Sequence, residues 1–172
     1  KYAFENAIYI DAEHQISDKL AMSYGLRFSS FLRLGQDELN VYENDNPLVY
    51  NSDLKIYEKA EPIDTESYDR SDVISSFANL EPRVALAYQL DEKSSIKASY
   101  NKMSQYLHLL SNTSSPTPLD VWTPSGKFIK PQLLDQVAIG YFKNYNIYSL
   151  EVESFYKNIK NRFDCIDGAN LI

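Results

Sequence analysis

The segment Leu20–Leu34 alternates apolar and polar residues over most of its length. Its apolar positions are Leu20, Met22, Tyr24, Leu26, Phe28, Leu32 and Leu34, and the positions between them include Ala21, Ser23, Gly25, Arg27, Ser29 and Arg33. Successive side chains of a β-strand point to opposite sides of the sheet, so this pattern predicts a strand with one apolar and one polar face. The segment is much longer than the usual strand of about 5–6 residues. A tilted membrane-spanning strand, which needs about 9–11 residues, fits this length, and a long soluble hairpin strand is the alternative.

The same alternation predicts six strands in all, joined as three hairpins. The expected strands are Phe4–Ile16, Leu20–Leu34, Phe77–Leu90, Ser95–Gln105, Asp135–Lys143 and Ile147–Ile159. Each hairpin closes in a short turn, whereas long loops over about residues 35–73 and 106–134 join one hairpin to the next. Pro82 lies inside the third strand and lacks an N–H donor, so it marks a bulge or a weakly paired end.

This layout distinguishes two kinds of all-β protein. Short turns at one end and long loops at the other are typical of outer-membrane barrels, whereas soluble sandwiches space their turns more evenly. We therefore expect an all-β fold, an antiparallel sheet that forms about six strands of a larger transmembrane β-barrel. No run of about 18 apolar residues predicts a membrane-spanning helix, and this does not count against spanning strands.

The amino-acid composition limits the classes of partner that the chain is expected to have. The chain has 14 Tyr, 8 Phe and 1 Trp, and tyrosine favours both strands and membrane interfaces. The net charge of −7 argues against nucleic acid as a partner. The imbalance lies in Gly35–Val73, where eleven acidic residues face three basic ones, a net of −8.

Charged side chains gather on the face opposite the aliphatic one. In a wide barrel that face lines water or a plug, and in an ordinary antiparallel sheet it is the solvated face. Strand patterning alone does not separate these two readings. We expect the first, and we predict that the lumen-facing residues include Arg27, Arg83, Lys97, Glu151 and Glu153.

Aromatic residues in the loops are the candidate ligand-binding residues. Trp122 lies among Pro116, Pro118 and Pro124, and an aromatic side chain on a proline-stiffened loop suits stacking on a sugar or peptide. The alternative is that Trp122 pins its loop onto the barrel wall. The acidic loop adds three further candidates, Tyr42, Tyr50 and Tyr57.

Motifs for catalysis and metal binding are missing from the sequence. It contains no nucleophile elbow, phosphate-binding loop or dinucleotide fingerprint. His14 and His108 are far apart, and neither has a Cys or His at metal-ligand spacing. We expect no enzyme activity, no metal site and no cofactor.

Five stretches resemble the barrel domain of TonB-dependent outer-membrane receptors. They are Leu80–Asn112, Thr117–Gly126, Ile129–Gln132, Gln136–Tyr141 and Glu153–Asn158. The resemblance is to the Bacteroidetes-type, SusC-like branch, whose members carry an N-terminal carboxypeptidase-regulatory-like domain. It is specific from about Leu80 to Leu171, and the first hairpin fits it less specifically.

The resemblance implies a barrel of about 22 strands closed by a separate plug. Such receptors import a nutrient, such as a siderophore, a glycan or a peptide, with energy passed on by TonB. The present chain shows no plug domain, TonB box or signal peptide, so we expect residues 1–172 to be a partial barrel domain in the outer membrane of a Gram-negative cell. The implied partners are outer-membrane lipid, the rest of the barrel and plug, the TonB complex through that plug, and a surface lipoprotein. The alternative is a soluble all-β carbohydrate- or protein-binding module.

Overall fold

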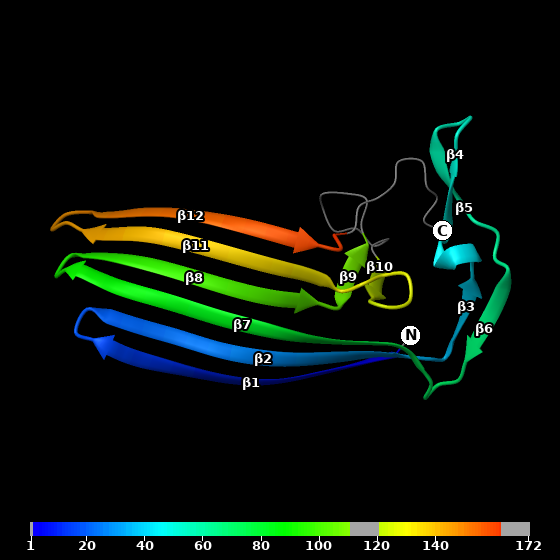
Figure 1. The fold of residues 1–172 in the computed structure, drawn as a ribbon, viewed down its shortest axis with the longest axis horizontal. Coiled ribbons are helices and arrows are strands. Elements are labelled where there is room, and N and C mark those ends of the chain that lie inside the picture. Colours follow the sequence, from blue (N-terminus) through cyan, green and yellow to red (C-terminus); the bar gives the residue numbers. More distant parts are fainter. Residues whose placement is uncertain (1, 111–120, 163–172) are drawn as a thin grey trace.

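The computed structural model describes residues 2–110 and 121–162, and its main feature is one large antiparallel sheet (Figure 1). Six long strands form this sheet in the order β1-β2-β7-β8-β11-β12, each antiparallel to its neighbours. Their bounds are β1 (Tyr2–Ser17), β2 (Leu20–Leu34), β7 (Val73–Asp91), β8 (Ser94–Gln105), β11 (Gln132–Asn144) and β12 (Ser149–Lys160). The prediction of six antiparallel strands paired in sequence order is therefore confirmed.

The long connections contain more secondary structure than the sequence analysis predicts. The first holds β3 (Asp37–Val41), the 3-10 turn η1 (Glu43–Asp45), β4 (Leu48–Asn51), β5 (Ile56–Lys59) and β6 (Asp64–Tyr68), and the second holds β9 (Leu107–Leu110) and β10 (Val121–Pro124). β3 pairs with β6, β4 with β5, and β9 with β10. The interpretation of residues 35–73 and 106–134 as plain loops was wrong in this respect. Strands this short show too few alternating residues to stand out in a polar sequence.

The two kinds of connection lie at opposite ends of the sheet (Figure 1). The turns that follow β1, β7 and β11 gather at one end, and the small hairpins of the long connections lie at the other. Residues 111–120, in the middle of the second long connection, lie outside the described residues. We call the two ends of the sheet the turn end and the loop end.

Strand register divides the sheet into an apolar and a polar face. Residues that lie directly opposite each other on paired strands point to the same side of a sheet. One such hydrogen-bonded row crosses all six strands as Ala12, Tyr24, Val84, Tyr100, Val137 and Tyr156. The adjacent row on the other face is Asp11, Gly25, Arg83, Asn101, Gln136 and Lys157.

Burial in this sheet is the reverse of that in a soluble domain. Side chains of the apolar face are exposed, as with Ile8 at 72% and Ile139 at 56%. The only buried hydrophobic residues in the described part of the chain are Phe31, Tyr42 and Tyr106, and all three belong to the loop end. A soluble domain buries such a face against a second layer, so the apolar face here is a surface in need of a cover.

Both edges of the sheet are open. β1 and β12 each pair on one side only, and they are 16 and 12 residues long. A long unpaired edge presents a row of backbone donors and acceptors to any further strand. The sheet is therefore suited to extension at both sides.

Pro82 marks the place where the sheet splits. β7 pairs with β8 only from Arg83 to Asp91, and the earlier part of β7 pairs with β2 alone. Beyond the same point, β8 pairs only with β11. The prediction of a weakly paired end at Pro82 is confirmed, and the split leaves the loop end of β7 open to the chain that follows β8 (Figure 1).

Candidate functional site

A buried polar cluster lies on the polar face at the loop end, beside the split between β7 and β8. We call it the Tyr106 cluster, and its members are Ser29, Asn79, Glu81 and Tyr106. Tyr106 directly follows β8, and its ring stacks on Phe31 of β2 with the ring centroids 5.1 Å apart. Ser29, Glu81 and Tyr106 are almost fully buried. The connection after β8 therefore folds back over the polar face.

The hydrogen bonds of the Tyr106 cluster form a chain with one direction. Ser29 Oγ donates to Glu81 Oε1 at 2.6 Å, so its single proton is used there. The Tyr106 hydroxyl, 2.7 Å from Ser29 Oγ, must then be the donor to Ser29. Asn79 Nδ2 donates to the Tyr106 hydroxyl at 2.9 Å. Each group thus donates to the next, an arrangement in which neighbouring hydrogen bonds strengthen one another.

Cations lie beside this cluster. Arg27 Nε is 3.8 Å from Glu81 Oε2, and its Nη2 is 3.9 Å from Glu5 Oε1. Arg33 Nη2 donates to Asp37 Oδ2 at 2.7 Å. A Cβ added to Gly126 would run into the Arg33 guanidinium. Glycine at this position therefore lets the returning chain approach the end of β2 closely.

The returning chain has its own buried polar contact. His108 Nε2 and Ser125 Oγ are 3.0 Å apart, and both residues are buried. Ser125 N also donates to the Tyr106 carbonyl oxygen at 2.7 Å. Burial lowers the pKa of His108, which favours a neutral imidazole at neutral pH.

The two long connections meet through Lys127 and Phe128. Lys127 Nζ lies 3.4 Å from Glu66 Oε2 and 3.7 Å from Asp45 Oδ1. The Tyr42 ring packs edge-on against Phe128, with the centroids 5.7 Å apart. The loop end is thus a joint structure of both connections.

The structure separates the four predicted ligand-binding residues. Tyr50 and Tyr57 face each other across β4 and β5 with their centroids 5.1 Å apart, and they are 53% and 48% exposed. Trp122 is 61% exposed and lies on β10 opposite Leu109. Tyr42 is buried against Phe128, so its ring is the least accessible of the four.

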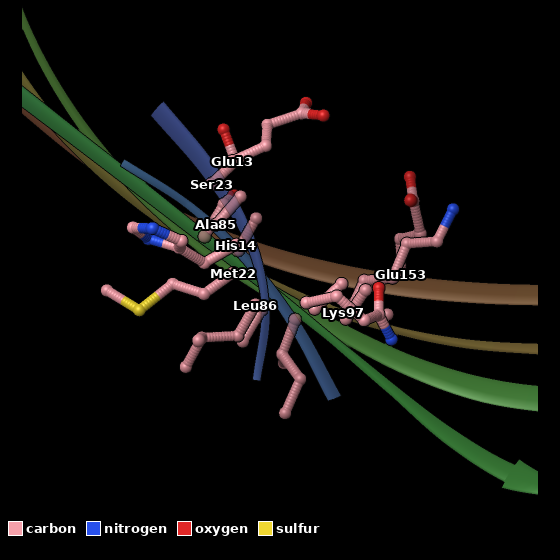
Figure 2. A pocket seen from close by; sticks show the side chains of 16 residues that line it. Glu13, His14, Met22, Ser23, Ala85, Leu86, Lys97 and Glu153 are labelled. Atoms are coloured by element: carbon pink, nitrogen blue, oxygen red, sulfur yellow. The ribbon is translucent and has the colours of Figure 1, made fainter. Parts of the chain in front are cut away.

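A hollow of about 640 Å³ runs across the middle of the sheet (Figure 2). Most of its lining residues belong to the polar face, and the small ones among these are Ala21, Ser23, Ala85, Ala87, Ser99, Ala138 and Gly140. Lys97 and Glu153 also line it. Glu13 and Glu153 extend to one side of the sheet in Figure 2, whereas His14, Met22 and Leu86 extend to the other.

The predicted lumen-facing residues share this polar face. Arg27 opposes Glu81, which is two residues before Arg83. Lys97 opposes both Ala87 and Gly140, and Gly140 opposes Glu153. Their common side of the sheet agrees with the sequence pattern.

Sequence reasoning missed the Tyr106 cluster. The cluster depends on a contact of Ser29 with Glu81, 52 positions along the chain, and on a contact of Ser29 with Tyr106, 77 positions along the chain. No local sequence pattern encodes contacts at such separations. One signal was present in the sequence. Phe31 is a large apolar residue on the polar face of β2, between Ser29 and Arg33. An apolar side chain out of phase with its strand indicates that another segment packs on that face.

The described residues contain no group of three or more His, Cys, Asp or Glu side chains able to hold a metal ion. Within the same residues, no helix is long and apolar enough to cross a membrane. Comparison of the chain with protein-family models, curated proteins and solved structures finds no match. The family resemblance therefore stays a prediction.

Tyr106→Phe tests the Tyr106 cluster. The substitution keeps the ring stack on Phe31 but removes the hydroxyl that joins Asn79 to Ser29, at an expected cost of about 1–3 kcal/mol. We expect faster amide hydrogen exchange over residues 106–110 and 121–131, by roughly tenfold or more. Tyr148→Phe, on an exposed side chain at the turn end, is the matched control. Equal exchange in the two variants would contradict the assignment.

Acidification tests the junction at Lys127. The hydrogen bond from the Tyr68 hydroxyl and then the Lys127 ammonium hold the pKa of Glu66 below its ordinary 4.5. The stabilisation from ionised Glu66 is therefore complete above pH 4.5 and is lost as the pH falls through the lowered pKa. Spin labels at Thr65 and Lys130 should show a broader distance distribution in acid. The Glu66→Gln variant should show the broad distance distribution at every pH. A distribution that still changes with pH in that variant would assign the effect to another group.

Proposed function

We propose that this chain is part of the membrane-spanning wall of a TonB-dependent outer-membrane receptor that imports a nutrient such as a siderophore, a glycan or a peptide. One observation carries the proposal. The chain folds its own connection over the polar face of the sheet, while the large side chains of the apolar face remain exposed. A soluble domain would be expected to do the opposite.

The burial pattern supports lipid as the cover of the apolar face. In a wide membrane barrel the apolar residues point outward to lipid, and the polar residues point inward to water or a plug. The apolar runs Leu20–Phe28 on β2 and Leu80–Leu90 on β7 have about the length that a bilayer requires of a tilted strand. The open edges at β1 and β12 would pair with further strands of the same barrel.

The residues of the polar face support the proposal that this face lines the lumen of a barrel. Arg27, Arg83, Lys97, Glu151 and Glu153 project from it, and small side chains between them leave a hollow in the wall. A plug domain in the lumen would pack against this hollow and would provide the link to TonB. The Tyr106 cluster then narrows the lumen at the loop end.

The acidic connection is the proposed recognition element. Tyr50 and Tyr57 form an exposed aromatic pair on the β4–β5 hairpin, within the stretch that carries the charge of −8. Such a field steers a basic or metal-chelate ligand, and aromatic faces add stacking area. We propose that this hairpin captures ligand or docks a surface lipoprotein. The chain itself has no catalytic role and no cofactor in this proposal.

Arginine substitutions on adjacent residues test the sidedness. Leu86 and Ala85 are neighbours in β7 that belong to opposite faces. In the full-length receptor, Leu86→Arg should cost about 2–4 kcal/mol of barrel stability, because it places a cation in the bilayer. Ala85→Arg should assemble normally, as judged by heat-modifiable migration. Equal assembly of both variants would remove the support for a lipid-facing side. Full stability of the protein in water without detergent would instead favour the soluble binding module.

Removal of the β4–β5 hairpin tests recognition. Deleting residues 47–60 spares the β3–β6 ladder, because the Ala60 N–H bonds the Pro47 carbonyl oxygen at the base of the hairpin. The receptor should assemble but take up ligand or retain its partner at least about tenfold less well, because the exposed Tyr50–Tyr57 pair is lost. The double variant Tyr50→Ser with Tyr57→Ser, which keeps the length of the hairpin, is the control and should give the same loss. Unchanged uptake and partner capture would move the recognition role to the Trp122 hairpin.

A further inference from the structure

The apolar band on the exposed face is oblique to the hydrogen-bonded rows of the sheet. On the first three strands, one row consists of Ile10, Leu26 and Pro82. One step past the Arg83–Asn101 pair, where β7 and β8 no longer pair, the positions level with this row are Lys102, Asp135 and Asn158 on the last three strands. The row therefore changes from apolar to polar in the middle of the sheet, although all its residues lie on one face.

The border of the band at the loop end shifts by about four residues. On β1, β2 and β7 the unbroken apolar run ends at Ile8, Phe28 and Leu80, which share a row, and the next row on this face holds Asn6 and Ser30. On β8, β11 and β12 they end in the row of Tyr100, Val137 and Tyr156. That row passes through Val84 on β7, which is four positions closer to the turn end than Leu80.

At the turn end, the apolar run of β12 extends further than those of β8 and β11. On β2 the apolar positions begin at Leu20, whose row passes through Tyr88, Ile96, Tyr141 and Val152. Beyond Val152, the apolar positions continue through Leu150 to Tyr148, just before β12. The run is therefore as long from Tyr148 to Tyr156 as from Leu20 to Phe28. On β11 the position opposite Leu150 is Lys143, so the inclination of the band rests on its border at the loop end.

The inclination has the size expected of strands tilted in a barrel. A shift of about four residues is about 13 Å along a strand, against about 24 Å across the five strand spacings of the sheet. The ratio gives an inclination of about 30°, near the tilt of about 35–45° that barrel closure requires. Tyrosines lie at both borders on β12, where interfacial aromatic side chains are expected.

We propose that the bilayer crosses this sheet obliquely, so that Lys102, Asp135 and Asn158 lie in the lipid headgroup layer while Ile10, Leu26 and Pro82 of the same row lie in hydrocarbon. The inference rests on the proposed function and adds to it the depth in the bilayer at which these residues lie. The Tyr100 hydroxyl, which donates to Asp135 Oδ1 at 2.7 Å, stands at this border with its ring toward the band and its polar end toward the headgroups.

Spin-label depth measurements test this inference in the full-length receptor, reconstituted in phosphatidylcholine vesicles. Single cysteines replace Leu26, Asn158 and Ile139 in a Cys165→Ser background, and accessibility to oxygen is compared with accessibility to a water-soluble nickel chelate. The label at Ile139, in the middle of the band, should favour oxygen, as should the label at Leu26. The label at Asn158 should favour the nickel chelate by roughly tenfold relative to Leu26.

The outcomes separate the inference from the function beneath it. Equal depth at Leu26 and Asn158, with Ile139 in lipid, would overturn the oblique crossing and leave the lipid-facing wall intact. Access of the nickel chelate to Ile139 would overturn the lipid-facing wall itself. If Leu26→Cys fails to assemble, Ile10→Cys and Lys102→Cys make the same comparison between row-mates.

Discussion

Register across six strands is the constraint on which the other features of this structure depend. Because each strand pairs in antiparallel order with the next, side chains of one kind line up in rows and the sheet acquires two chemically different faces. A slip of one residue in any strand would place charges such as Arg83 among the aliphatic residues. The hollow, the buried polar cluster and the inclined band all follow from this alignment.

The split at Pro82 explains why a polar network is buried at the loop end. Proline ends the ladder between β7 and β8, and the chain leaving β8 enters the space that opens there. Apart from Phe31, the side chains that it contacts on β2 and β7 are polar, so Tyr106 is held by hydrogen bonds as well as by its stack on Phe31. Burying Glu81 without Ser29 and Arg27 beside it would be costly.

The long strands could be predicted from the sequence, and the loop end could not. Alternation over ten or more residues leaves little doubt about a segment such as Leu20–Leu34, and β2 has these same bounds. The pairs Tyr50–Tyr57 and Trp122–Leu109 lie on strands of four residues, where alternation carries little information. Contacts such as Ser29–Tyr106 depend on how distant segments meet, and Phe31 alone hinted at them.

The open edges have a consequence for how this chain behaves apart from other strands. Strand pairing satisfies the outer backbone groups of β1 and β12 wherever a neighbour is found, and another copy of the chain offers an equally good one. In dilute detergent the isolated sheet would exchange partners, and at higher concentration it would polymerise edge to edge. The order in which strands arrive during assembly would then decide between a closed structure and a fibre.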